Sequence, residues 1–343
     1  MIGGVSMNKN DFCHLHVHSE YSTLDGINKI PKLCKYVKEL GMSSCAITDH
    51  GTLHGIIEFY KVAKENGIKP LIGVEAYVTM DEDSDDLNIK RNKDNFHAIM
   101  IAQNLEGLKN LYWLTNQGNL HNFYHRPRMS VSNLMKRSEG IIVTSSCLGG
   151  LVAKAAAIDP MTGAPVKGRN FDDESKLFRD PDNQAVRALS VFNDLFPGRF
   201  YAEIQDHPTF WKQDIYNKWL IEHARKLSIP LVITADAHFM TEQDKPIHDM
   251  AMAQQYGKTL KEYTSNVEDM VYDETHCIRS SEEMLASAKK YDVEEAFHNT
   301  MEISSRCDVP ISLGKYQLPE FDITKTEDYK DFLVWKSECK ATN

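Results

Sequence analysis

The chain has 343 residues, 42% of them hydrophobic and 26% charged, which is enough to bury one large core or two modest ones and argues against disorder of the whole chain. The formal net charge of −10 argues against a protein that grips nucleic acid through bulk electrostatics. No apolar run approaches the roughly 20 residues that cross a bilayer, residues 1–10 lack the apolar core of a signal peptide, and the seven cysteines form no C-x-x-C pair. We therefore expect a soluble cytoplasmic protein without a membrane partner, a disulfide framework or a structural zinc knuckle.

Short apolar runs alternate along the chain with stretches of helical periodicity. We expect strands at residues 12–17, 44–48, 70–78, 98–102, 140–145, 200–204 and 231–234. Helices are expected between them, at 30–40, 56–66, 105–117, 185–195 and 211–227. Strands that alternate with helices are typical of βαβ units, and a count of seven strands favours an α/β fold with a distorted, TIM-like β/α barrel over a small open sheet.

Two segments interrupt this alternation of strands and helices. Residues 81–86 are almost entirely acidic, and residues 159–182 are rich in Gly, Pro and Asp. Both are expected to be solvated loops, and the second is long enough to be a lid.

Three alternating histidines, His14, His16 and His18, lie in and just after the first expected strand. Because side chains two positions apart in a strand point the same way, this spacing predicts one face that carries three imidazoles. Imidazoles are common ligands of divalent metals, whereas a lone histidine is more often a packing residue. A polar turn with the carboxylate of Asp25 follows and favours a metal site.

Other residues of metal-ligand type stand where the expected strands end. In a parallel barrel the carboxyl ends of all strands lie at one rim, and side chains from different strands meet there. The spacing therefore predicts one cluster made of His16, His18, Asp25, His50, Glu75, Cys147, Asp236 and His238. His97 precedes its apolar run, so either that strand is reversed or His97 reaches the rim from a loop, and the sequence leaves both open.

Five motifs carry a resemblance to a known family. They are His16-x-His18-x-x-Tyr21-Ser22-x-x-Asp25-Gly26, Ile47-Thr48-Asp49-His50-Gly51, Gly73-x-Glu75-Ala76-Tyr77, Ser146-Cys147-Leu148-Gly149 and Asp236-Ala237-His238. In order and spacing they resemble the polymerase and histidinol phosphatase (PHP) domain, of the subtype at the N-terminus of the bacterial DNA polymerase III alpha subunit. The resemblance implies a distorted seven-stranded β/α barrel over residues 11–320. Residues 1–10 would be an N-terminal extension, and 321–343 a C-terminal tail or the start of a polymerase linker.

The resemblance also implies a site for three divalent metal ions. Its nine ligands fall on His16, His18, Asp25, His50, Glu75, His97, Cys147, Asp236 and His238. Glu75 would bridge ions, while His16, His18 and Asp236 would complete one ion, Asp25, His50 and His238 a second, and His97 with Cys147 a third. All nine positions carry the expected residue type, so we expect a competent site. His14 matches no ligand and is expected to pack or to support a ligand.

Mixed His, carboxylate and Cys ligands suit zinc, manganese or iron better than magnesium. Clustered ions of this kind activate water and neutralise a phosphodiester, so the predicted chemistry is phosphoester hydrolysis, which the net negative charge does not exclude. Two residues are candidates for substrate contacts. Arg128 lies in a stretch resembling a family segment near the site and is expected either to hold a phosphate bidentately or to be a surface arginine. His207 follows the strand expected at 200–204.

Three functions are compatible with these motifs. The first is a metal-dependent 3′–5′ exonuclease that acts on a DNA 3′ end beside a replicative polymerase body, continuous with the chain or separately encoded. The second is a small-molecule phosphatase like the histidinol phosphate members of the family, and the third is a structural module without catalysis. The polymerase-type motifs favour the first over the second, and the cost of keeping nine polar groups together argues against the third. No polymerase activity is expected of this chain alone.

Overall fold

The structure is a computed structural model that describes residues 11–84, 86, 90–156, 181–265, 272–314 and 333. The chain divides into two units, Met1–Pro310 and Ile311–Asn343, and every helix and strand named below belongs to the first. The extension expected at 1–10, the tail expected at 321–343 and most of the lid expected at 159–182 therefore lie outside the described residues, apart from isolated positions.

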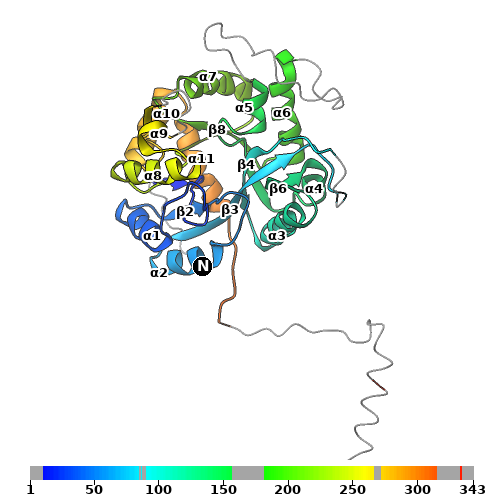
Figure 1. The fold of residues 1–343 in the computed structure, drawn as a ribbon, viewed down its shortest axis with the longest axis horizontal. Helices are drawn as coiled ribbons and strands as arrows, with labels where there is room; N and C mark the ends of the chain where they lie inside the picture. Colours follow the sequence, from blue (N-terminus) through cyan, green and yellow to red (C-terminus); the bar gives the residue numbers. More distant parts are fainter. Residues whose placement is uncertain are drawn as a thin grey trace, which may run out of the picture. The chain divides into compact units, whose positions relative to one another are not determined.

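The first unit alternates strands and helices along most of its length (Figure 1). The strands are β1 (Cys13–His14), β2 (Ser44–Ile47), β3 (Lys69–Thr79), β4 (Phe96–Ala102), β5 (Phe123–Tyr124), β6 (Arg126–Ser130), β7 (Ile141–Thr144), β8 (Phe200–Gln205) and β9 (Leu231–Thr234). The helices are α1 (Ile30–Glu39), α2 (Ile56–Glu65), α3 (Leu105–Leu120), α4 (Val131–Lys136), α5 (Leu151–Ala156), α6 (Pro181–Leu195), α7 (Trp211–Lys226), α8 (Lys245–Gln255), α9 (Leu260–Ser265), α10 (Ser281–Lys290) and α11 (Glu294–Arg306), with a 3₁₀ turn, η1, at Glu242–Asp244.

Seven of the strands form a nearly closed barrel in the order β1-β2-β3-β4-β7-β8-β9. The barrel closes where the chain after β1 meets the chain after β9: the His18 amide donates to the Ala237 carbonyl at 2.9 Å, and the Ala237 amide donates to the His16 carbonyl at 3.1 Å. The short ribbon β5–β6 is attached to β3 through β6. The predicted seven-stranded barrel is confirmed, and Figure 1 shows helices arranged around it.

One strand of the seven-stranded barrel, β4, runs against the others, as in the first of the two alternatives that the sequence left open for His97. It pairs antiparallel with both β3 and β7, with His97 opposite Tyr77. The segment between β3 and β4 contains no helix among its described residues, and an antiparallel neighbour needs no helical crossover. The reversal brings the amino end of β4, which carries His97, to the rim where the neighbouring strands end. It also decides between the two alternatives that the sequence left open.

The barrel interior contains a layer of apolar side chains from all seven strands. Its buried members are Cys13, Leu15, Ala46, Leu71, Ile99, Ile101, Ile142, Tyr201, Val232, Ile303 and Cys307. Ile303 belongs to α11 and Cys307 follows it, so this C-terminal helix covers one end of the barrel. Burial of such side chains is the main stabilising term, at roughly 1.5–3 kcal/mol each. Because α11 covers one end, polar residues collect at the other.

The acidic segment at 81–86 is not simply solvated. The Asp81 carboxylate accepts hydrogen bonds from the Arg128 guanidinium at 3.2 Å and from the Asn92 amide at 3.1 Å. Glu82 accepts from Ser132 at 2.8 Å, and Asp83 accepts from Asn133. These side chains attach the loop to β6 and α4.

Among the described residues, no helix is long and apolar enough to cross a membrane.

Asn28 holds the seam at which the barrel closes. Its fully buried amide donates to the carbonyls of His18 at 2.9 Å and Ala237 at 3.3 Å. We expect Asn28→Ala to lower the free energy of unfolding by about 1–3 kcal/mol, because buried acceptors lose their donor. The urea midpoint of the metal-free protein measures this. Asn119→Ala, at an exposed position in α3, should change stability by less than about 0.5 kcal/mol, and equal effects at both sites would contradict the role of Asn28.

Candidate metal centre

Near the open rim of the barrel, polar side chains replace apolar ones at the inward positions of the strands. We call the group of ligand-type side chains there the cup; it consists of His16, His18, Asp25, His50, Glu75, His97, Cys147, Asp236 and His238. Along β8 and β9, Tyr201 and Val232 lie in the apolar core, and the next inward positions are Glu203 and Thr234. The Thr234 hydroxyl donates to the Glu203 carboxylate at 2.5 Å, and Asp236 follows one step higher. Side chains two residues apart share a face of the strand. The inward side chains of each of these strands are therefore apolar near the core and polar near the rim.

Glu75 in β3 is the centre of this cup. Its Oε1 lies 2.8 Å from His97 Nδ1 and 3.5 Å from His16 Nε2. Its Oε2 lies 2.7 Å from His50 Nδ1 and 3.4 Å from His18 Nε2. The side chain of Glu75 is 1% exposed. One buried carboxylate therefore meets four imidazoles from three separate segments of the chain.

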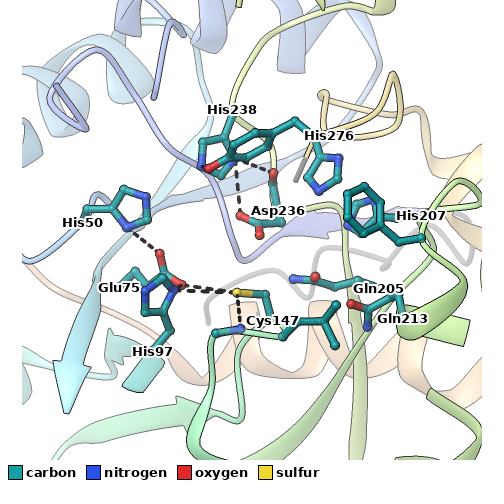
Figure 2. Close-up of a pocket in the computed structure, with 14 residues that line it drawn as sticks. His50, Glu75, His97, Cys147, Gln205, His207, Gln213, Asp236, His238 and His276 are labelled. Atoms are coloured by element: carbon teal, nitrogen blue, oxygen red, sulfur yellow. Dashed lines mark hydrogen bonds and ion pairs between the residues drawn. The ribbon is translucent and has the colours of Figure 1, made fainter. Parts of the chain in front are cut away.

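Asp236 and Asp25 extend the cup on either side. Asp236 Oδ1 lies 3.0 Å from His16 Nε2, and it lies 3.5 Å from His238 Nδ1. Asp25 Oδ2 lies 3.1 Å from His50 Nε2, and Asp25 Oδ1 lies 3.9 Å from His238 Nε2. Figure 2 shows His50, Glu75, Asp236 and His238 around the same pocket.

Cys147 adds a sulfur ligand beside Glu75. Its Sγ lies 3.9 Å from Glu75 Oε1 and 3.7 Å from His97 Nδ1. The turn that carries it is tight: Ser146 has φ +60°, and a Cβ at Gly149 would stand 2.8 Å from the His97 ring. Asp236 also has a positive φ, of 47°. Left-handed non-glycine residues cost of order 1–3 kcal/mol each and gather at functional sites.

Together these distances connect all nine residues predicted from the sequence. Three groups within the cup, His16 with His18 and Asp236, His18 with His50 and His238, and Glu75 with His97 and Cys147, each bring ligand atoms within 4.8 Å of one another. In a tetrahedral site with bonds of about 2.1 Å, neighbouring ligand atoms are separated by about 3.4 Å. The separations in the cup are of this size, so several clusters here could bind metal ions.

The tautomers of His16 and His18 point to a positive charge between them. His16 Nδ1 lies 2.8 Å from the Glu203 carboxylate, which can only accept, so its proton is on Nδ1. The Ser22 hydroxyl donates to Asp49 at 2.7 Å and thus accepts from His18 Nδ1 at 3.0 Å. Both Nε2 atoms are then unprotonated in the neutral rings, yet they face each other at 3.1 Å. Two lone pairs at this distance repel unless a positive charge lies between them, either a proton on His16 or a metal ion that displaces that proton.

Unpaired buried atoms fit the same conclusion. Asp25 Oδ1, His50 Nδ1, Glu75 Oε2 and Asp236 Oδ1 are buried without a hydrogen-bond partner. His50 Nδ1 lies 2.7 Å from Glu75 Oε2, and Asp236 Oδ1 lies 3.0 Å from His16 Nε2. These buried atoms are therefore compensated either by protons on the two imidazoles or by bound cations. The donor set of imidazole, carboxylate and thiol fits a divalent transition metal.

The electrostatics of the cup suit a cation. Burial alone would raise the pKa of Glu75, but His97 and the other imidazoles hold it well below its usual value. Burial and the nearby His50 lower the pKa of His18, and burial with His18 lowers that of His238 to about 3. At neutral pH the carboxylate is ionised and these two imidazoles are neutral. Both are the forms that bind metals.

His14 does not share the face of His16 and His18, so the expected row of three imidazoles is wrong at its first member. Cys13 and Leu15 point into the barrel core, and His14 therefore points outward, where its Nε2 lies 2.9 Å from the Arg279 carbonyl. The strand ends at His14 and the chain bends at His16, which resets the alternation. The packing role expected for His14 agrees with its complete burial.

Arg128 is neither at the surface nor among the residues that line the pocket. Its side chain is fully buried, and its guanidinium donates to the carbonyl of Asn92 at 3.0 Å and to that of Asp94 at 3.1 Å, as well as to Asp81. These contacts give Arg128 a structural role in the loop before β4. They do not support the predicted phosphate contact, because its polar atoms are turned to the protein.

His207 lines the pocket, as a substrate contact requires. Four further residues of the site were not foreseen: Glu203, Asp49, Tyr272 and His276. Glu203 could have been found from the sequence, because a carboxylate at an inward position of the apolar strand FYAEIQ is unusual. The Tyr272 hydroxyl, which lies 3.3 Å from both Asp25 Oδ2 and His238 Nε2, comes from a segment without a sequence signal.

The chain is similar in sequence to known proteins over most of its length. The model of the PHP domain family matches residues 14–207, more than half of the chain. DNA polymerase III subunit alpha of Borreliella burgdorferi is 36% identical over 320 residues, which cover 92% of this chain and 25% of that protein. The same subunit of Helicobacter pylori is 36% identical over 334 residues, covering 96% and 26%. A solved amidohydrolase from Chromobacterium violaceum matches with a TM-score of 0.38 and 13% identity over 66% of this chain and 87% of that one.

The chain spans about a quarter of the length of the curated relatives that it matches. The family model covers seven of the nine cup residues, which lie between His14 and His207, and the relatives match over nearly the whole chain. The protein belongs to the PHP domain family and corresponds to the N-terminal region of DNA polymerase III alpha subunits.

Proposed function

We propose that this chain is a metal-dependent phosphodiester hydrolase that removes nucleotides from a DNA 3′ end, and that it acts beside a replicative polymerase. The observation that carries the proposal is the cup itself. Nine ligand-type side chains form one connected cluster around Glu75, with unpaired lone pairs and orphaned carboxylate oxygens directed at one another. Three divalent ions, of zinc, manganese or iron, would satisfy these groups.

The chemistry follows from the donor set. Divalent ions, when bound, lower the pKa of water and offset the negative charge of a phosphodiester. In the proposed assignment Glu75 would be shared between ions, and His16, His18 and Asp236 would hold one of them. His97 and Cys147 would hold another, and Asp25, His50 and His238 would hold the remaining one. Glu203 and Asp49 keep the imidazoles of His16 and His18 in the ligating tautomer, the first directly and the second through Ser22.

The similarity to polymerase subunits supports DNA as the substrate. A pocket of about 150 Å³ opens beside the cup, which is smaller than the roughly 300–1,000 Å³ of typical ligand sites, so it would take only the reacting end of a longer substrate. The net charge of −10 offers little nonspecific affinity for DNA, so a polymerase body would present the primer end. A small-molecule phosphatase and a purely structural module are the alternatives that the first experiment separates.

We expect the manganese-loaded protein to release nucleotides from the 3′ end of labelled single-stranded DNA, and Glu75→Gln to lower the rate by about 100-fold or more. The reason is that Glu75 contacts four imidazoles of the cup, whereas loss of a supporting group alone costs 10- to 100-fold. Cys147→Ser, which changes one terminal ligand, should cost less, and chelation should abolish activity.

Glu222→Gln is the matched control, because this exposed glutamate of α7 forms an ion pair with Lys226 and does not line the pocket. Its rate should equal that of the unchanged protein. Hydrolysis of histidinol phosphate but not of DNA would favour the phosphatase, and metal binding without either activity would favour the structural module.

The Glu203 carboxylate accepts a hydrogen bond from His16 Nδ1 at 2.8 Å, and it also accepts hydrogen bonds from the Thr144 and Thr234 hydroxyls. Glu203→Gln keeps the size but lets an amide N–H compete with the His16 proton, so we expect a 10- to 100-fold weaker metal affinity. Competition with a chelator of known affinity measures it. Glu262→Gln, an exposed capping glutamate, should leave metal affinity unchanged, and an unchanged affinity in Glu203→Gln would contradict the support role.

Metal binding should release protons. Burial lowers the pKa of His16, but the carboxylates of Asp236 and Glu203 outweigh it and raise the pKa well above its usual value; Glu75 and Asp25 do the same for His50. These imidazoles hold protons at pH 7 that a cation must displace, so affinity should rise from pH 6 to pH 8. Titration calorimetry in two buffers of different ionisation enthalpy counts the protons. A binding heat independent of the buffer would contradict this expectation.

A further inference from the structure

The pocket has a second wall that contributes none of the nine predicted ligands. On one side of the pocket lie His50, Glu75, His97, Cys147, Asp236 and His238. Figure 2 shows His207, His276 and Gln213 on the other side, with the His207 and His276 rings beside each other. The two rings are stacked, with centroids 3.6 Å apart and planes 6° from parallel. The His276 ring centroid is 6.5 Å from that of His238.

The network around Asp273 sets the tautomer of His207. The Thr275 hydroxyl donates to the Asp273 carboxylate, so its oxygen accepts from His207 Nδ1 at 2.7 Å. The proton of the neutral ring is therefore on Nδ1, and Nε2 carries a lone pair. His207 is only 4% exposed, lines the pocket and has no hydrogen-bond partner at Nε2. A buried acceptor in a ligand pocket is thus left without a donor.

His276 has the opposite tautomer. Its Nδ1 lies 3.0 Å from the Asp273 backbone amide, which can only donate, and 3.1 Å from Asp273 Oδ1. Because the amide hydrogen points at Nδ1, we assign the proton of the neutral ring to Nε2. Asp273 itself is held by Thr209, whose hydroxyl donates to it at 2.8 Å. Because Nδ1 and Nε2 lie on different edges of an imidazole, the Nε2 edges of both rings turn away from Asp273. The pair therefore offers one acceptor and one donor side by side.

A hydroxyl group is the ligand that matches this pair, since it donates to one nitrogen and accepts from the other. We propose that His207 and His276 form a subsite that binds a sugar hydroxyl of the substrate, the free 3′-hydroxyl of the terminal nucleotide. This inference rests on the proposed function for the identity of the substrate. The 3′-hydroxyl stands only a few bonds from the 5′ phosphorus of its own nucleotide, in keeping with the short distance from His276 to the cup.

A fourth metal ion is the competing occupant. His207, Asp273 and His276 bring three ligand atoms within 4.8 Å of one another. The nitrogens that face Asp273 are already used, however, since His207 Nδ1 donates to Thr275 and His276 Nδ1 accepts from the Asp273 amide. A cation at that point would meet the N–H of His207 Nδ1, and it would compete with the Asp273 amide for the lone pair of His276 Nδ1. The hydrogen-bonded arrangement therefore favours the hydroxyl subsite.

The test compares two nucleotides that differ in one hydroxyl. Thymidine 5′-monophosphate and its 3′-deoxy analogue are titrated into the metal-loaded protein, which requires no cleavage. We expect the unchanged protein to prefer the 3′-hydroxyl form by about tenfold, because a site with a buried acceptor rejects the analogue that leaves it unpaired. In His207→Phe, which keeps the ring stack and removes both nitrogens, the preference should fall to about one. His207→Gln, which restores an acceptor, should recover part of it.

His223→Phe is the matched control, because His223 also stacks on a ring, that of Trp219, and uses its Nδ1 in a hydrogen bond outside the pocket. Its preference should equal that of the unchanged protein. Equal binding of the two nucleotides by the unchanged protein, no binding of either, or loss of one bound metal ion in His207→Phe would each overturn the subsite. Failure of the proposed function appears separately, as absent DNA cleavage with the hydroxyl preference intact.

Discussion

The buried carboxylate of Glu75 is the constraint on which the rest of the site depends. Four imidazoles lie within 3.5 Å of its two oxygens, and its side chain is 1% exposed. A carboxylate removed from water needs compensating charge, and neutral imidazoles do not supply it. Unless some rings are protonated, cations must balance the charge of the cup. Burial of these groups would therefore destabilise the metal-free protein, whereas in the metal-bound protein they would serve as ligands. For this reason the proposed function depends on metal binding.

The two ends of the barrel have different roles: one end is apolar and stabilises the fold, and the other end carries the polar cup. At one end α11 and the apolar layer exclude water, and at the other end the same strands carry polar side chains at their next inward positions. Glu203 lies between the two, buried and bonded to Thr144, Thr234, Gln205 and His16. Because all ligands of the cup except Asp25 stand on a strand or within a few residues of its end, their positions are fixed mainly by the hydrogen bonds of the sheet. Asp25 lies in a turn, where its amide donates to the Ser22 carbonyl at 3.1 Å. Such rigid support holds ligand geometry within the tolerance that metal sites need.

The pocket combines two kinds of recognition. The cup supplies positive charge once loaded and therefore suits a phosphoryl group, whereas the stacked histidines supply a neutral donor and acceptor. Charge alone would not distinguish a phosphodiester from a phosphomonoester, but a second contact at a fixed distance selects what is attached to the phosphorus. Since the chain spans about a quarter of its polymerase relatives, the delivery of a DNA end to this pocket would fall to other parts of such a protein.

The sequence by itself predicted the seven barrel strands, five of the eleven helices that the described residues form and eight of the nine residues of the cup, because alternation of apolar residues and the position of polar ones at strand ends are local properties. The ninth residue, His97, is assigned to the site only through the family resemblance. The sequence did not determine the direction of β4, which depends on the connection from β3, or the outward turn of His14, which depends on a bend after it. It also placed Arg128 near substrate, whereas the fold buries it against the Asp81 loop. Tyr272, Asp273 and His276 join the pocket from a distant segment, and only tertiary structure decides such contacts, because no local pattern records which residues meet across a barrel.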